Sequence, residues 1–271
     1  MQLTQSYKPA NALYFYAKIF CLVTMLIDHI GAFLYPQFGT LRLIGRLCVG
    51  LYFYFFACSL NHYLQQDFPP SRKVHLKEEF PKTLSFCCNL FLLGLVADIP
   101  FILFFKGSWL SSIFGYYGLI GIYMYALKYF CSLVPNKYLK RILASLMWLC
   151  GFGYFQFHLP QISTFTYGGL GYVLITFFLY YGVSYKHKVD PLAILSCFGL
   201  SFPFGSVAYA QPLFIILMLA PLLFISLFQE LFPQFTDVEI MVHKKTSTFF
   251  WLFYPIHLYI IGIISYWVGA S

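Results

Sequence analysis

Residues 24–35 read TMLIDHIGAFLY and place an aspartate and a histidine side by side in an apolar run that extends over residues 12–35. A run of this length can cross a membrane as a helix, because about 20 apolar residues span the hydrocarbon core. An ionised carboxylate at mid-bilayer costs about 3 kcal/mol or more, so Asp28 needs a partner, a water-filled cavity or a chemical task. The stretch therefore predicts a transmembrane helix with polar side chains of a definite role.

The rest of the chain indicates an integral membrane protein. Of its 271 residues, 60% are hydrophobic and only 10% are charged. Apolar runs recur throughout, which predicts an all-α class: a polytopic transmembrane helix bundle in one domain, residues 1–271, with a cytoplasmic loop at 66–82. We expect about nine spans, near residues 12–35, 41–65, 83–105, 110–131, 139–158, 162–184, 191–208, 210–230 and 246–268.

The net charge of +8 is interpreted as a topology signal and not as a sign of nucleic acid binding, because Lys and Arg favour cytoplasmic loops. With nine spans, nearly all loop cations gather on the side of the N-terminus, and little beyond Arg42 and Lys106 falls on the other side. The N-terminus is therefore expected in the cytoplasm and the C-terminus outside. The eight cysteines lie in or beside apolar runs without the short paired spacings of zinc sites, and we expect them to be packing residues and no metal to be bound.

With this topology, polar side chains from four spans converge on the outer half of the membrane. Arg42 and Arg46 are four residues apart and share one helix face. The whole set comprises Asp28 and His29 in the first span, Arg42 and Arg46 in the second, Asp98 in the third, and His257, nearer the middle of the membrane, in the last, with Tyr254 close to it.

Two interpretations of this set remain open. Either acid could simply pair with Arg46 and hold helices together. Alternatively, the set lines a functional cavity, in which His29 is a general base whose ring is oriented by Asp28 or Asp98. An arginine in such a cavity could hold a carboxylate, a phosphate or a developing oxyanion.

Three segments of this sequence resemble a known family. FCLVTMLIDHIGAFLYP, LRLIGRL and, near the end, FYPIHL are similar in order and spacing to the TraX family of bacterial membrane proteins, most clearly over residues 18–60 and 250–260. The founding member of that family N-acetylates the processed F pilin. The resemblance implies acetyl transfer from acetyl-CoA in a bacterial inner membrane. It assigns functional importance to Asp28, His29, Gly45, Arg46, Tyr254 and His257.

Together these observations predict a membrane acyltransferase that acetylates an amine or hydroxyl of an extracytoplasmic acceptor, such as a pilin N-terminus or a glycan, with membrane lipid as its surroundings. Transport coupled to protons and a non-catalytic assembly role are the alternatives. We expect His29, Asp28, Arg46 and His257 to be catalytic and Arg42, Asp98 and Tyr254 to bind substrate. The cytoplasmic residues expected to hold the phosphates of the coenzyme are Arg72, Lys73, Lys77, Lys140 and Arg141.

Overall fold

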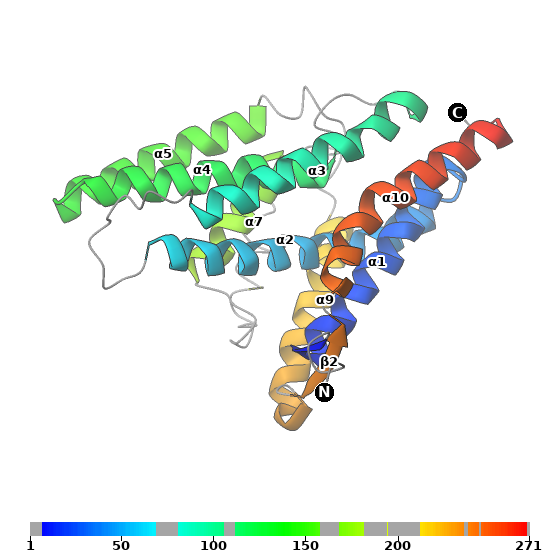
Figure 1. Ribbon diagram of the computed structural model, residues 1–271, viewed down its shortest axis with the longest axis horizontal. Coiled ribbons are helices and arrows are strands. Elements are labelled where there is room, and N and C mark those ends of the chain that lie inside the picture. Colours follow the sequence, from blue (N-terminus) through cyan, green and yellow to red (C-terminus); the bar gives the residue numbers. More distant parts are fainter. Residues whose placement is uncertain are drawn as a thin grey trace. The chain divides into compact units, whose positions relative to one another are not determined.

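The computed structural model describes residues 7–68, 81–105, 112–157, 168–181, 194, 212–235, 238–243 and 245–269, and nearly all of them are helical (Figure 1). The elements in chain order are β1 (Tyr7–Asn11), α1 (Ala12–Phe33), α2 (Gly39–Asp67), α3 (Lys82–Phe104), α4 (Ile113–Leu133), α5 (Lys137–Phe157), α7 (Gly168–Tyr180), α9 (Pro212–Leu231), β2 (Glu239–His243) and α10 (Lys245–Val268), with a 3₁₀ turn at Pro233–Phe235.

The predicted all-α class is confirmed. Seven of the nine predicted runs coincide with α1, α2, α3, α4, α5, α9 and α10, with ends that agree within three residues, and α7 lies inside an eighth. Within the described ranges, four helices are long and apolar enough to cross a membrane: α1, α2, α3 and residues Thr248–Val268 of α10. The run expected at 191–208 lies outside the described residues apart from Ile194.

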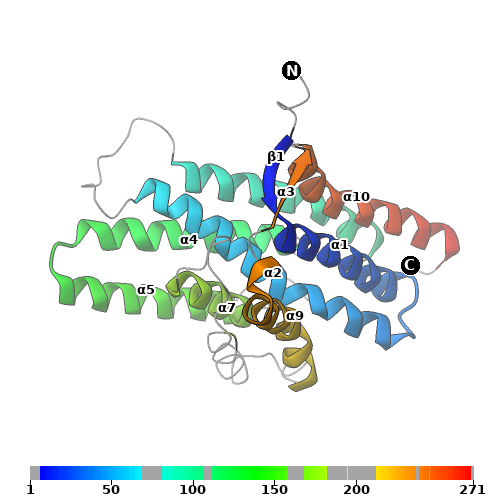
Figure 2. The ribbon, with the colours of Figure 1, turned by 90° about the horizontal axis from the view of Figure 1, so that it is seen from below.

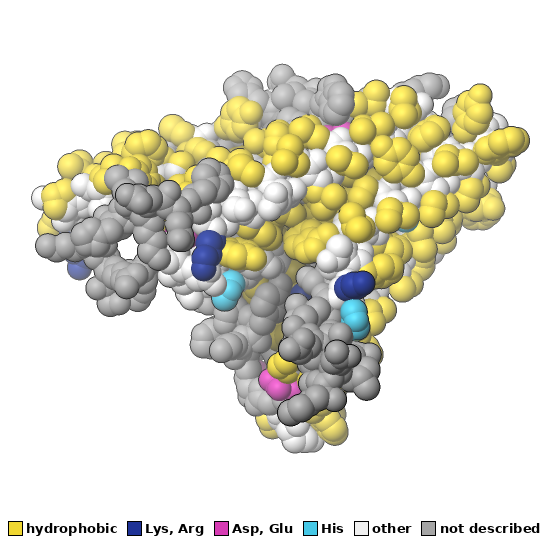
Figure 3. Space-filling view, viewed as in Figure 1, with side chains coloured by type: hydrophobic (Ala, Val, Ile, Leu, Met, Phe, Trp, Pro, Cys, Tyr) yellow, Lys and Arg dark blue, Asp and Glu magenta, His cyan; other side chains and the backbone are white. Residues whose placement is uncertain are grey.

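Apolar side chains cover the outside of these helices, as expected for contact with lipid. Along α3, Leu92, Val96 and Leu103 recur on one helical face with exposed fractions of 58%, 47% and 66%. In Figure 3 hydrophobic side chains dominate the visible face, and Lys, Arg, Asp and Glu are sparse on it. Water would make such a surface unstable, whereas hydrocarbon matches it.

The described helices form two compact units, and the division passes through α2. The first unit contains β1, α1, α2 up to Phe55, α9, β2 and α10. The second contains α2 from Phe56 onward, α3, α4, α5 and α7. Because one helix belongs to both units, the division does not test the prediction of a single domain.

A short antiparallel sheet, which the sequence did not predict, joins two distant parts of the first unit. β1 pairs with β2 in a register that runs from Tyr7 opposite His243 to Asn11 opposite Glu239. Both α1 and α10 begin at this sheet, and they run in the same direction side by side (Figures 1 and 2). Phe15 contacts Phe250 near their starts at 6.0 Å between ring centroids.

The far ends of α1 and α10 are also in contact. The Ser265 hydroxyl donates to the carbonyl oxygen of Phe33 at 3.4 Å. A contact at both ends shows that the two helices stay together along most of their length. The first and last segments of this unit therefore form one parallel pair.

Close packing in the first unit depends on glycine. A Cβ atom at Gly50 of α2 would lie 2.1 Å from the backbone oxygen of Met218 in α9. Only a residue without a side chain permits this approach, and small residues are the usual means by which membrane helices come together. In the same unit, the Gln229 side chain donates to the Tyr14 hydroxyl at 3.3 Å, and the Tyr14 and Tyr54 hydroxyls are 3.2 Å apart.

The second unit packs α3 against α4 in a similar way. A Cβ atom at Gly94 would lie 2.2 Å from the backbone nitrogen of Gly115. At the start of α3 the Asp67 carboxylate accepts hydrogen bonds from the backbone nitrogens of Lys82 and Thr83, which helix starts otherwise leave unpaired. The seven described cysteines are all free, and five of them are buried as the predicted packing role requires, whereas Cys88 is half-buried and Cys150 is exposed.

We predict that Gly50→Ala lowers stability whereas Gly153→Ala does not. The new methyl group at residue 50 would meet main chain that cannot rotate away, an overpacking cost of about 1–3 kcal/mol. Gly153 of α5 is the matched control, because a Cβ atom there meets nothing within 4 Å. Thermal unfolding of the two variants in detergent measures the difference. Equal midpoints would contradict the packing described here.

Candidate functional site

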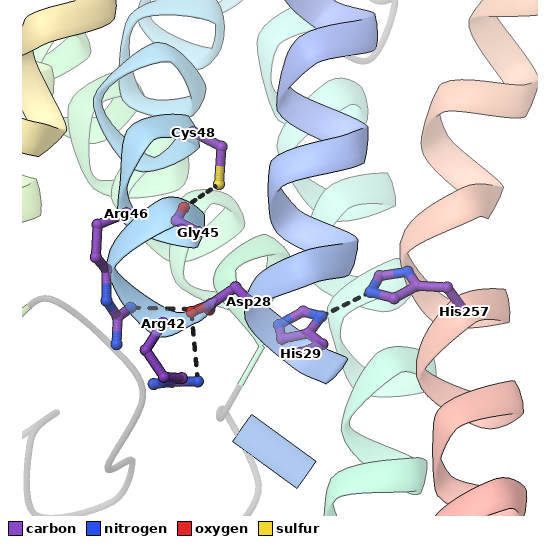
Figure 4. A network of polar contacts seen from close by, with 7 residues as sticks. All are labelled: Asp28, His29, Arg42, Gly45, Arg46, Cys48 and His257. Carbon is purple, nitrogen blue, oxygen red and sulfur yellow. Dashed lines mark hydrogen bonds and ion pairs between the residues drawn. The ribbon is translucent and has the colours of Figure 1, made fainter. Parts of the chain in front are cut away.

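The end of α1 and the start of α2 bring one carboxylate against two guanidinium groups (Figure 4). Asp28 Oδ1 lies 3.5 Å from Arg42 Nη1, and Asp28 Oδ2 lies 3.9 Å from Arg46 Nη1. Both arginines reach the same carboxylate because residues four apart lie on one helix face. The pairing that the sequence left open is thus present, and Asp28 has both arginines as its partners.

Gly45 allows this arrangement. A Cβ atom at Gly45 would lie 2.1 Å from Cβ of Asp28 and 2.6 Å from its Oδ1 atom, so the carboxylate rests directly on the backbone of α2. The arginines one residue after and three residues before Gly45 then flank it. The close crossing of α1 and α2 at this glycine sets where the charges lie.

The ion pairs leave hydrogen-bonding capacity unused. Asp28 Oδ1 is buried and makes no hydrogen bond with any part of the chain that the structure describes. The Arg42 side chain is 26% exposed, against 12% for Arg46. Two guanidinium groups face one carboxylate, so these three side chains together carry a net positive charge.

His29 points to the other side of α1 and meets α10. Its Nδ1 atom lies 2.6 Å from Nε2 of His257 (Figure 4). Nδ1 of His257 in turn lies 2.8 Å from the carbonyl oxygen of Phe253. Adjacent residues on a helix diverge by about 100°, which explains why Asp28 and His29 have different neighbours. The sequence predicted an acid as the partner of the His29 ring, and the described Nδ1 contact is to His257 instead.

Aromatic rings surround the histidine pair. The Tyr254 ring lies edge-on to His29 at 5.9 Å and to His257 at 5.6 Å between centroids, and Tyr254 is buried. Phe33 and Phe253 contact one histidine each. Rings packed this closely restrict how the two imidazoles can turn.

Asp98 belongs to the second unit and has a partner there. Its Oδ1 atom accepts from the backbone nitrogen of Ser112 at 2.6 Å, and the Ser112 hydroxyl in turn accepts from the backbone nitrogen of Gly115. A carboxylate at the start of α4 is favoured by the unpaired N–H groups and the helix dipole. This contact gives Asp98 a structural task, and its predicted role in substrate binding stays a prediction.

The basic residues predicted to hold a coenzyme are described only in part. Lys140 and Arg141 lie exposed in the first turns of α5. Arg72, Lys73 and Lys77 lie outside the described residues. The structure therefore leaves the predicted phosphate contacts untested.

Sequence reasoning missed the main-chain carbonyl of Phe253 as a member of the site. The sequence does contain a signal for this contact. Phe253 lies four residues before His257 in FYPIHL, and a helical side chain can donate to the backbone carbonyl one turn earlier. The direct contact between His29 and His257 was not predicted either, since nothing in the sequence relates the rotation of α1 to that of α10.

Comparisons with known proteins give one finding. The family model described as TraX protein matches residues 16–265, which is most of the chain. Comparison with curated proteins and with solved structures finds no match.

We predict that Asp28→Asn and Arg42→Gln are energetically coupled. Asp28→Asn leaves both arginines without their carboxylate, and Arg42→Gln leaves Asp28 with Arg46 alone. The double variant removes the whole Asp28–Arg42 pair. The coupling free energy should be about 0.5–3 kcal/mol, the range for residues in contact. Thermal unfolding of the singles and the double in detergent measures it. The control combines Asp28→Asn with Lys245→Gln. Lys245 is exposed at the start of α10, so the effects of these two changes should be additive. Additive effects in the cycle with Arg42→Gln would contradict the ion pair.

Proposed function

The chain belongs to the TraX family, and from this premise we propose that it is a membrane-embedded acyltransferase of the bacterial inner membrane. The family is associated with pilin acetylation, which points to transfer of an acetyl group. The donor we propose is acetyl-CoA, and the acceptor is an amine or hydroxyl on an extracytoplasmic protein or glycan. A pilin N-terminus is the acceptor that the family favours.

The observation that carries the proposal is the contact between His29 and His257. The two residues are separated by most of the chain, yet α1 and α10 place their ring nitrogens 2.6 Å apart in an apolar surrounding. Polar side chains are costly in such a place unless they have a partner or a task. A histidine held by another group is the usual form of a general base.

The proposed reaction forms one bond and breaks one. The acceptor nitrogen attacks the carbonyl carbon of the thioester, a C–N bond forms, and the C–S bond breaks. The nitrogen gives up a proton to His29, which returns it to the departing thiolate, so that free coenzyme A is released. An ammonium acceptor first loses one proton to water, so that the neutral amine attacks. The second proton leaves its nitrogen for a neutral His29.

The arginines have the charge to assist this reaction. Negative charge develops on the carbonyl oxygen during the attack, and preorganised donors at that position lower the barrier. We propose that Arg46, with Arg42 beside it, stabilises that oxygen or a carboxylate of the substrate, while Asp28 holds both guanidinium groups in place. Tyr254 would line the substrate position beside the histidines.

We also propose nine membrane crossings with a cytoplasmic N-terminus. The parallel course of α1 and α10 supports an odd number, because two helices that start on the same side and both cross the membrane leave the chain ends on opposite sides. The distribution of Lys and Arg supports a cytoplasmic start. In this topology the turn between α1 and α2, next to Asp28 and the arginines, faces outward.

The proposed donor and acceptor then approach from opposite sides. The basic residues suited to coenzyme phosphates, of which Lys140 and Arg141 are described and exposed, lie on the cytoplasmic side of this topology. The cluster at the α1–α2 turn lies near the other surface. The thioester arm of the donor must therefore reach across much of the membrane.

We predict that a reporter fused after Ser271 lies outside the cytoplasm and that one fused before Met1 lies inside. The reason is the odd number of crossings combined with the cytoplasmic bias of Lys and Arg. Paired alkaline phosphatase and fluorescent protein fusions measure both positions. A cytoplasmic reporter at the C-terminus would remove the argument for an outward-facing site.

We predict acetyl transfer across the membrane by the purified protein in oriented vesicles. Labelled acetyl-CoA is supplied on the cytoplasmic side and a membrane-impermeant amine on the extracytoplasmic side, and the amine should become labelled. His29→Ala should lower the rate by about 10²–10⁴-fold, the contribution typical of a general base. His62→Ala is the control, because His62 is exposed and bonded to Gln66 within α2.

Three results would count against this proposal in different ways. Full turnover by His29→Ala would reject His29 as the base. Product that forms only when donor and acceptor share the cytoplasmic compartment would reject transfer across the membrane. Uptake of substrate into vesicles without any acyl donor, together with no transfer, would favour a transporter.

A further inference from the structure

A backbone carbonyl fixes the proton position on His257. Its Nδ1 atom lies 2.8 Å from the carbonyl oxygen of Phe253. A carbonyl oxygen can only accept a hydrogen bond, so Nδ1 of His257 carries a proton and donates it. In a neutral imidazole the other nitrogen then has no proton and acts as an acceptor. Nε2 of His257 is thus the acceptor nitrogen of this ring.

That acceptor determines the proton position on His29. Nε2 of His257 lies 2.6 Å from Nδ1 of His29, so in the neutral pair Nδ1 of His29 is the donor. The ring centroids are 4.9 Å apart and the planes differ by 11°. Rings with this centroid separation and this nitrogen–nitrogen distance have both facing nitrogens on the line between the two centroids. The rings therefore meet edge to edge and do not lie one above the other. The Nδ1–H bond of His29 therefore points along the lone pair of His257, as a strong hydrogen bond requires.

We propose that His257 is a positioning residue that holds His29 in the tautomer with a proton on Nδ1, so that the lone pair of His29 is on Nε2. The proposal rests on the acyltransferase function above, in which His29 takes a proton from the acceptor. It names the atom that takes the proton: one N–H bond of the acceptor breaks and one N–H bond forms at Nε2 of His29. From there the proton passes to the departing thiolate.

The arrangement also stabilises the product of that step. Once Nε2 is protonated, His29 is an imidazolium whose Nδ1–H bond to His257 becomes charge-assisted and therefore stronger. A carboxylate has this task in the serine protease triad. Here the partner is a neutral ring that is itself held by a peptide carbonyl, so no second charge has to be kept in the membrane. Asp28 is left to the arginines of α2.

The direct test is the tautomer of His29, measured by solid-state ¹⁵N NMR of protein labelled at histidine in lipid at neutral pH. The signals of His29 are identified as those missing from His29→Ala. We expect a protonated Nδ1 and an unprotonated Nε2 in the wild type, and a shift toward protonated Nε2 in His257→Leu. An unprotonated Nδ1 in the wild type, two protonated nitrogens, or an unchanged tautomer in His257→Leu would overturn the proposal.

Activity gives a second, independent test. Leucine at position 257 removes the acceptor, whereas glutamine keeps an oxygen that can accept from Nδ1 of His29. We expect His257→Leu to lower kcat by about 10²-fold or more with little change in KM, and His257→Gln to recover most of the loss. The control is His62→Leu, which should leave kcat unchanged. Equal losses in the leucine and glutamine variants would show a packing role only and would overturn the proposal.

The failures of the two proposals can be told apart. If the wild type has the expected tautomer but transfers no acetyl group, the acyltransferase function is rejected and the positioning by His257 stands. If transfer occurs but His29 carries its proton on Nε2, the positioning is rejected alone. If His257→Leu does not fold, the wild-type spectrum and the His257→Gln variant still decide.

Discussion

Hydrocarbon provides no partner for a polar side chain, so each polar group in these helices has to find one within the protein. The structure meets this requirement in several places. Asp28 lies between Arg42 and Arg46, Asp98 accepts from the start of α4, and Gln229 reaches the tyrosine pair of α1 and α2. These contacts join helices that apolar packing alone would not orient, because lipid and leucine are equally apolar.

α1 combines two such contacts in consecutive residues. Asp28 faces α2 and His29 faces α10, so one turn of helix connects an ionic cluster with a histidine pair. A glycine at position 45 lets the carboxylate approach the backbone of α2, and a peptide carbonyl of α10 holds His257. The two halves differ in chemistry: the ionic half offers positive charge, and the histidine half can take up a proton.

The short sheet between β1 and β2 gives the histidine pair its geometry. It ties the start of α1 to the start of α10, so the two helices run in parallel and their residues meet at a fixed depth. Without this tie, two apolar helices could slide or rotate against each other at little cost.

The sequence by itself determined seven of the described helices with their ends, the lipid-facing composition and the residues Asp28, His29, Arg42, Arg46 and His257 as members of polar contacts, because these depend on length, hydrophobicity and spacing along one helix. Arg42 and Arg46 share a face through helix geometry alone. Only the tertiary structure decided that His29 meets His257, that Gly45 receives Asp28, and that Asp98 is bonded to the start of α4. Such contacts depend on how helices rotate and cross, and these angles follow from side-chain packing over the whole unit, which no local pattern in the chain encodes.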